Sequence, residues 1–161
     1  MKHIVSLHDF DPPTATAQEK KIAIVGGKPH LYKPKNVKAA ELILHSILVQ
    51  NDPERPLQGA VKLTVEWRFR AKTHKAGTYR TTRPDTDNLQ KMLKDVLTDR
   101  GWWKDDAQVC VETITKIWSD DPGLFIEAEE IDDAIEDDPN HIAVGGGYRK
   151  GRILPTCMKG E

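Results

Sequence analysis

Two aspartates and a lysine stand together in residues 83–91, which read RPDTDNLQK. Carboxylate oxygens are the hard ligands that Mg²⁺ takes, and Mg²⁺ keeps water and substrate phosphate in the rest of its shell. A metal held by two or three aspartates activates a water, and a neighbouring lysine helps to hold the charge that develops on a phosphate. Asp85, Asp87 and Lys91 therefore predict metal-assisted phosphodiester hydrolysis.

A second acidic pair, Asp105 and Asp106, follows beside the start of a strand pattern. Asp106 supplies a further metal ligand if the fold brings it near Asp87. The first pair also has a structural interpretation, because aspartate is a favoured helix N-cap and Asp87 with Gln90 has the spacing of a capping box. Asp105 and Asp106 equally suit a turn.

The lysine has a structural alternative as well, since an Asp87–Lys91 pair one turn apart stabilises a helix by about 0.3 kcal/mol. A D-x-D pattern on its own is a weak signal, and the structural interpretation then outweighs the catalytic one. Here the pattern lies between a basic segment and a second acidic pair. This combination favours the catalytic interpretation.

The residues after Asp87 follow a helical pattern. On a wheel of about 100° per residue, one face collects the aliphatic residues Leu89, Met92, Leu93, Val96 and Leu97. Lys91, Lys94 and Asp95 fall on the opposite side. We expect a helix over about 87–98 that buries the aliphatic stripe and presents Asp87 and Lys91, with Asp85 in the turn before it.

Strand patterns outnumber helical ones along the rest of the chain. We expect strands over 4–9, 61–69, 107–118 and 124–130, and a hairpin over 20–35 around Gly26-Gly27. A first helix is expected over about 36–50, with Asn36 as its N-cap. These elements predict an α+β fold in which two main helices pack on a small mixed β-sheet.

The net charge of −1 averages two unlike halves. Residues 1–83 contain 15 Lys and Arg against 7 Asp and Glu, whereas residues 84–161 contain 9 against 18. A basic half joined to an acidic half leaves a nucleic-acid partner possible. The two cysteines form no C-x-x-C zinc pair, and no stretch approaches the roughly 20 apolar residues of a membrane span. We expect a cytoplasmic protein with no membrane association.

Two motifs resemble one known family. Residues 85–91 (DTDNLQK) and 101–109 (GWWKDDAQV) are similar to the D-x-D-N, lysine and W-x-D-D-A-Q-V pattern of RusA-family Holliday junction resolvases. The resemblance implies a small homodimer that cuts four-way DNA junctions in recombination and repair, with Mg²⁺ or Mn²⁺. It places metal-binding catalytic aspartates at Asp85, Asp87 and Asp106, the functional lysine at Lys91, and supporting residues at Asn88 and Asp105.

The basic segment fits the same expectation. Arg68 lies on the face of strand 61–69 opposite its apolar residues, and loop 71–84 contains no acid. We expect phosphate contacts from Arg68, Arg70, Lys72, Lys75, Arg80 and Arg83. The alternative is an ordinary solvated loop. Trp102 and Trp103 either stack on splayed bases or pack in the core, and the core is favoured for Trp103.

The composition changes beyond Ile131. We therefore expect a nuclease domain over 1–131, which contains the resemblance, and an acidic, glycine-rich tail over 132–161. We expect this tail to be solvated and mobile, with docking on a partner or on the basic loop as the alternative. Two other functions stay open for the whole chain. One is a non-catalytic junction-binding module on the same fold. The other is a different D-x-D enzyme, disfavoured because no hydrophobic strand precedes Asp85.

Overall fold

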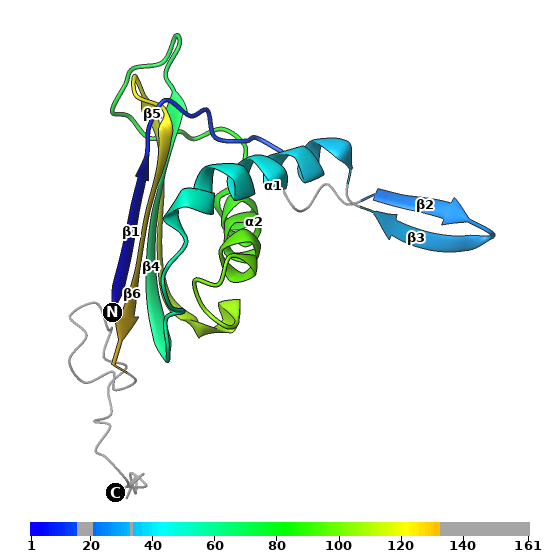
Figure 1. Ribbon diagram of the computed structural model, residues 1–161. Helices are drawn as coiled ribbons and strands as arrows, with labels where there is room; N and C mark the ends of the chain where they lie inside the picture. The colour runs from blue at the N-terminus through cyan, green and yellow to red at the C-terminus, as the bar shows by residue number, and fades with distance from the viewer. Residues whose placement is uncertain (16–20, 33, 133–161) are drawn as a thin grey trace, which may run out of the picture. The chain divides into compact units, whose positions relative to one another are not determined.

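A computed structural model describes residues 1–15, 21–32 and 34–132, and Met1–Ile131 form one compact unit. The expected tail lies outside the described residues from position 133 onward. Figure 1 shows a four-stranded sheet with two helices on one side of it. None of the helices in the described part of the chain is long and apolar enough to cross a membrane.

The main sheet has the order β1 (Lys2–Leu7), β6 (Gly123–Ile131), β4 (Ala60–Arg70) and β5 (Val109–Ser119). The β1–β6 and β6–β4 pairs are antiparallel, whereas β4 and β5 are parallel. A parallel pair needs a crossover connection, and the helix between β4 and β5 provides it. The predicted α+β fold with a small mixed sheet is therefore confirmed.

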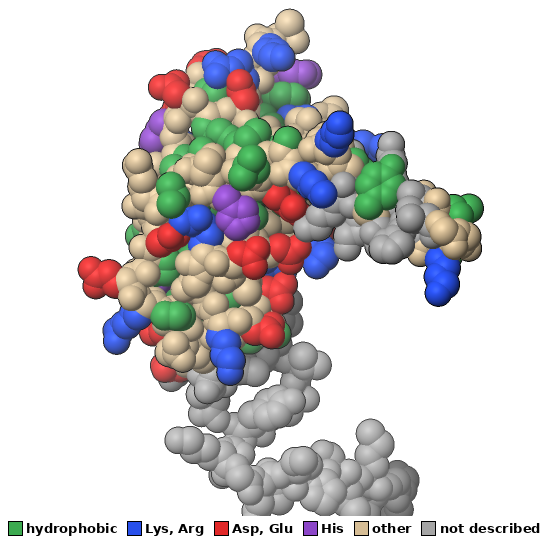
Figure 2. Space-filling view, turned by 45° about the vertical axis from the view of Figure 1, so that its right-hand side comes forward, with side chains coloured by type: hydrophobic (Ala, Val, Ile, Leu, Met, Phe, Trp, Pro, Cys, Tyr) green, Lys and Arg blue, Asp and Glu red, His purple; other side chains and the backbone are tan. Residues whose placement is uncertain are grey.

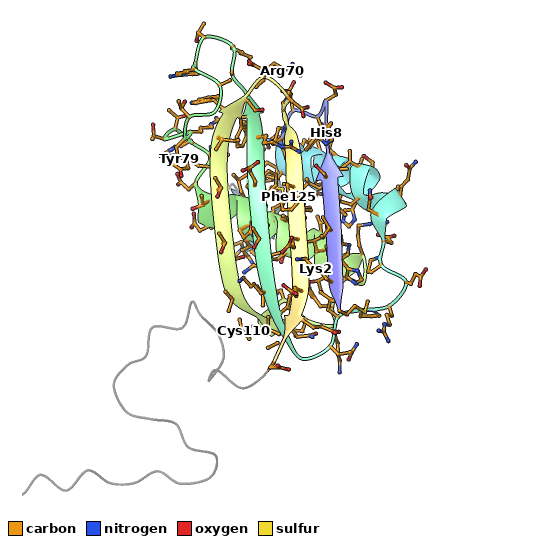
Figure 3. All side chains as sticks on the ribbon, turned by 90° about the vertical axis from the view of Figure 1, so that its left-hand side faces the viewer. Lys2, His8, Arg70, Tyr79, Cys110 and Phe125 are labelled. Carbon is orange, nitrogen blue, oxygen red and sulfur yellow. The ribbon has the colours of Figure 1, made fainter. Side chains whose placement is uncertain are left out.

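The central strand β4 explains which side of the sheet carries the helices. Its side chains alternate between buried and half-buried, and the buried set is Val61, Leu63, Val65, Trp67 and Phe69. Helices α1 (Lys35–Leu48) and α2 (Thr86–Asp99) pack on this apolar face. Figure 3 shows the opposite face of the sheet, which neither α1 nor α2 covers and on which Phe125 is labelled.

The expected helix over about 36–50 is present, but its expected N-cap and the expected start of the strand at residue 107 were wrong. Helix α1 begins at Lys35, with Pro34 rather than Asn36 at its N-cap, because proline lacks the N–H that a first helical turn leaves unpaired. It continues into the short 3₁₀ helix η1 (Val49–Asn51). A second 3₁₀ helix, η2 (Asp106–Gln108), replaces the expected start of the strand at Ala107.

The predicted hairpin is present as a separate two-stranded sheet. Its strands β2 (Lys21–Val25) and β3 (Lys28–Tyr32) pair antiparallel around Gly26 and Gly27. Both glycines have positive φ, at 59° and 76°, which a tight two-residue hairpin turn requires.

Candidate active site

Asp85 and Asp87 lie together at the N-terminal end of α2. Asp85 occupies the N-cap position with extended backbone angles, but its carboxylate accepts no capping hydrogen bond. Asp87 is exposed in the first turn of the helix. Asp85 is therefore the N-cap residue by position, but neither carboxylate forms a hydrogen bond or ion pair with any other described residue, so the predicted capping bonds are not made. The positive end of the helix dipole favours negative charge at this position.

The predicted aliphatic stripe holds this helix end in place. All of its members are buried against the sheet and α1, namely Leu89, Met92, Leu93, Val96 and Leu97. Lys91 therefore points outward, one turn beyond Asp87, and its Nζ lies 3.7 Å from Oδ1 of Asp95. The Asp87–Lys91 pair, which was the structural alternative for this lysine, does not form. Asn88 and Gln90 are buried, and the side-chain amide of Gln90 has no hydrogen-bond partner among the described residues.

In the second acidic pair, Asp105 has a structural role and Asp106 is unpaired among the described residues. Asp105 caps η2, because its Oδ1 accepts the backbone N–H of Ala107 at 2.9 Å. Gln108 completes the capping box by accepting the backbone N–H of Asp105 at 3.2 Å. Asp106, in the first turn of η2, has no such partner in the described part of the chain. Its carboxylate is thus available for another role.

Asp106 lies far from the first pair within one chain. Lys116 of β5 contacts the loop beside Asp85, and η2 directly precedes the start of β5 at Val109. At about 3.3 Å per strand residue, roughly 20 Å of β5 separates Lys116 from Val109. Accordingly, residues 1–15, 21–32 and 34–132 contain no cluster of three acidic, histidine or cysteine side chains suited to a metal.

The two exposed carboxylates at the start of α2 nevertheless fit a hard cation. They present oxygen ligands two residues apart, they have no competing partner among the described residues, and Mg²⁺ commonly takes only one or two protein carboxylates. Figure 2 shows acidic side chains gathered on the side of the molecule that carries the helices. Asp85 and Asp87 would hold the ion, with Lys91 one turn away.

Loop 71–84 is tied to the free edge of β5 rather than solvated throughout. The backbone N–H of Gly77 donates to Trp118 at 2.8 Å, and that of Arg80 donates to Lys116 at 2.9 Å. Tyr79 pairs with Ile117 across this edge and is largely exposed, as Figure 3 shows. The loop thereby continues the sheet and leads directly into Asp85.

Aromatic stacking organises the basic part of this loop. The guanidinium carbon of Arg80 lies 4.0 Å from the ring centre of Phe69 and 4.7 Å from that of Trp118. His74 stacks on Trp118 with ring centres 4.0 Å apart. Burial against these rings lowers the pKa of Arg80. Arg80 also donates to the carbonyl of Arg83, so it acts as a structural element of the loop.

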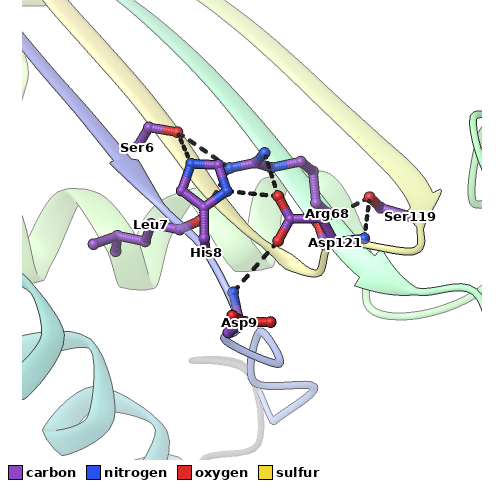
Figure 4. A network of polar contacts seen from close by, with 7 residues as sticks. All are labelled: Ser6, Leu7, His8, Asp9, Arg68, Ser119 and Asp121. Carbon is purple, nitrogen blue, oxygen red and sulfur yellow. Dashed lines mark hydrogen bonds and ion pairs between the residues drawn. The ribbon is translucent and has the colours of Figure 1, made fainter.

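Arg68 is likewise occupied by protein groups, as the network in Figure 4 shows. Its Nη2 donates to the carbonyl of Leu7 at 3.0 Å and its Nη1 lies 3.6 Å from Asp121, which is 2.5 Å from His8. Its side chain is only 14% exposed. A direct phosphate contact from Arg68 stays a prediction, and the observed contacts join β1, β4 and the β5–β6 turn.

The other predicted DNA-contacting residues differ in availability. Arg70 pairs with Asp11 through Nε at 3.0 Å, so part of its charge is compensated. Lys72, Lys75 and Arg83 are exposed, and no acidic side chain in the described part of the chain pairs with them. These three are therefore the members of the predicted set best placed to meet an anion.

Both neighbouring tryptophans belong to the core. Trp102 is fully buried and Trp103 is 1% exposed, so the alternative in which they stack on nucleic-acid bases is wrong. Trp103 donates its Nε1–H to Oγ1 of Thr98 at 2.7 Å. This contact folds the turn after α2 back onto the last turn of the helix. Trp102 and Trp103 thus pack in the segment that connects α2 to η2.

Lys116 lies beside the site, although its sequence position alone did not predict it. Its Nζ donates to the carbonyls of Thr82 and Pro84 at 3.0 and 2.6 Å, immediately before Asp85. Burial lowers the pKa of Lys116 and the charge of Arg80 acts in the same direction, while Asp85 opposes them. The sequence feature that could have indicated Lys116 is a lysine at an inward-facing position of a strand. In β5 this position is in register with the buried Trp67.

Comparisons with known proteins agree with the resemblance noted above. The family model described as endodeoxyribonuclease RusA matches residues 11–129. A crossover junction endodeoxyribonuclease rusA of Lactococcus phage r1t is 29% identical over 126 residues, covering 76% of this chain and 95% of its own. The uncharacterized protein YqaN of Bacillus subtilis strain 168 is 27% identical over 121 residues, covering 68% of this chain and 84% of its own.

Proposed function

Because this chain belongs to the endodeoxyribonuclease RusA family, we propose that it is a metal-dependent endodeoxyribonuclease that resolves four-way DNA junctions during recombination and repair. One observation carries the assignment of its site. Asp85 and Asp87 lie at the exposed N-terminal end of α2, where neither carboxylate forms a hydrogen bond or ion pair with another described residue. The junction as substrate is proposed from the printed name of the phage relative.

In this proposal, the residues of the site have different roles. Asp85 and Asp87 would hold Mg²⁺, with Mn²⁺ as an alternative ion of similar ligand preference. The ion, when bound, supplies activation of a water and neutralisation of phosphate charge. Lys91 projects from the same side of α2 and would exchange its surface pair with Asp95 for a phosphate oxygen. Its ammonium would then stabilise negative charge in the transition state.

The position of Asp106 supports a homodimer as part of the proposal. One chain does not bring Asp106 to the first carboxylate pair, since the length of α2 separates them. In a two-fold dimer, a surface near η2 of one copy can face the start of α2 in the other. We propose that Asp106 from a second copy completes each metal site. Asp105 supports it by capping η2, and Asn88 is buried directly beside Asp87.

The DNA would approach from the basic loop. Lys72, Lys75 and Arg83 are exposed on the segment that leads into Asp85, where they can neutralise phosphates next to the site. Arg68, Arg70 and Arg80 contribute positive potential while also holding the fold. Since the cytoplasm contains the DNA, we propose that the protein acts there and independently of membranes.

A labelled four-way junction, incubated with the protein and Mg²⁺ beside a duplex of matched sequence, tests this function. We expect paired cuts in the junction, little cutting of the duplex, and no cutting when EDTA replaces Mg²⁺. Junction binding without any cut strand, at every Mg²⁺ and Mn²⁺ concentration, would instead support the non-catalytic binding module. Equal cutting of junction and duplex would contradict junction selectivity.

A further inference from the structure

The segment that presents Asp85 is held by two cationic side chains. Three successive carbonyls precede this residue, and all three accept hydrogen bonds from cations. Lys116 donates to Thr82 and Pro84, and Arg80 donates to Arg83. Backbone carbonyls in a surface loop are usually left to water, so a charged donor at each of them marks a segment held in one geometry.

Lys116 is anchored at its other end by the sheet. It lies on β5 in register with Trp67, which is fully buried at the centre of β4. The backbone carbonyl of Lys116 also accepts the N–H of Arg80 at 2.9 Å. One residue therefore joins the rigid core to the loop through both its backbone and its ammonium group.

This anchoring matters for Asp85, because its carboxylate forms no hydrogen bond or ion pair with any other described residue. The side chain accepts no capping hydrogen bond, and the backbone is extended at φ −76° and ψ 149° rather than helical. The peptide that precedes Asp85 thus sets the direction of its Cα–Cβ bond, from which the carboxylate extends. That peptide contains the Pro84 carbonyl, which Lys116 holds at 2.6 Å.

We propose that Lys116 is a positioning residue of the cation site, which fixes the direction of the Asp85 carboxylate by holding the carbonyls of Thr82 and Pro84. This inference rests on the proposed function, in which Asp85 and Asp87 bind the ion. Outer groups that orient metal ligands raise affinity for the metal by about 10- to 100-fold. Lys116 touches neither the ion nor DNA in this proposal, so it acts through Asp85 alone.

Titration of the purified protein with Mn²⁺ alone, followed by calorimetry or by electron paramagnetic resonance of the free ion, measures the effect without any cleavage assay. Lys116→Met removes the donor, and we expect its dissociation constant for Mn²⁺ to rise about tenfold or more. Lys116→Arg keeps a charged donor and should recover most of the affinity. The matched control is Lys94→Met, which removes another half-buried lysine facing β5, paired with Glu112 at 3.5 Å.

Several outcomes decide the proposal. An unchanged Mn²⁺ affinity in Lys116→Met would overturn the proposal, because Lys116 would then not position Asp85. A tighter affinity would also overturn it, because Lys116 would then act on the ion only as a like charge that weakens binding. An equal loss in Lys94→Met would also overturn it, since the effect would then be a general loss of packing. If Lys116→Met does not fold, as judged by circular dichroism, Lys116→Gln removes the charge and shortens the side chain. We expect its Mn²⁺ affinity to fall as well, and an affinity equal to that of the parent would overturn the proposal.

Junction cleavage by the parent protein separates this inference from the function on which it rests. If the parent cuts junctions in Mg²⁺ and the Lys116 variants bind Mn²⁺ as the parent does, only the inference fails. If the parent cuts no junction while Mn²⁺ affinity still depends on Lys116, the proposed function fails and the positioning role stands. Failure of the parent to bind Mn²⁺ at all would overturn both.

Discussion

A mixed dimer, with Asp87→Asn in one chain and Asp106→Asn in the other, tests where the third carboxylate of each site comes from. The 14 residues of α2 span about 20 Å, and Asp106 lies near the end of the helix opposite to Asp87. If Asp106 acts from a second copy, this dimer keeps one site in which all three aspartates are present. Nicking of the first strand should then proceed at about half of the parental rate, because one of two symmetric sites survives.

The reciprocal dimer reverses the expectation. When one chain carries both substitutions and the other carries neither, each site that is shared between chains contains one defect. We expect this dimer to be as inactive as either variant alone. Both dimers contain the same two substitutions, so a difference between them reports only the chain from which Asp106 comes.

The assay requires pure mixed dimers, which two different affinity tags and sequential purification provide. A junction labelled on one strand is incubated with Mg²⁺, and nicked product is measured on a denaturing gel. Activity in the reciprocal dimer together with inactivity in the first dimer would refute the reasoning. Asp106 would then act within its own chain, and the separation that we describe would have to close on binding DNA.

Three further changes address stability and DNA contact. Asp105→Ala removes the cap of η2 and should lower the free energy of unfolding by about 1 kcal/mol in urea titrations, whereas Asp106→Ala should change it by less than about 0.5 kcal/mol. The hydrogen bond from His8 holds the pKa of Asp121 below its usual 3.8, so the stability it confers is complete above that pH and is lost as the pH falls further. Asp121→Asn should therefore flatten the fall in the urea midpoint below about pH 4, and an equally steep fall in this variant would contradict the assignment. Lys75→Ala should weaken junction binding and reduce the slope of log affinity against log salt by about 1, and an unchanged slope would exclude a phosphate contact.

The sequence predicts the elements whose patterns are local. Strict alternation in residues 61–69 indicates β4, and the aliphatic period after Asp87 indicates α2 with its correct buried face. The Gly26-Gly27 turn indicates the hairpin for the same reason. In each case the residues that decide the structure are neighbours along the chain, so a short window contains all the information that the element needs.

The parts that were missed depend on contacts between distant segments. Arg68 and Arg70 alternate outward as a DNA-binding pair would, but Asp121 and Asp11 reach them from elsewhere in the fold. The loop of Arg80 is held by aromatic rings of two different strands. Such partners are set by the strand order, which a local pattern does not contain.

The separation of Asp106 from the first carboxylate pair has the same origin. Two acidic motifs less than 20 residues apart along the chain suggest one site. The parallel pairing of β4 and β5 instead requires α2 to run the length of the sheet between them. The topology thus places the two motifs at opposite ends of this helix.

The central claim is that the carboxylates at the N-terminal end of α2 perform the metal-dependent chemistry. The most direct measurement compares the rates of Mg²⁺-dependent junction cleavage by Asp87→Asn and Asp99→Asn. These variants remove the same charge from exposed positions at the two ends of one helix. We expect Asp87→Asn to cut at least about 100-fold more slowly than the parent, and Asp99→Asn to cut at close to the parental rate. Cleavage by Asp87→Asn as fast as by the parent protein would contradict the account.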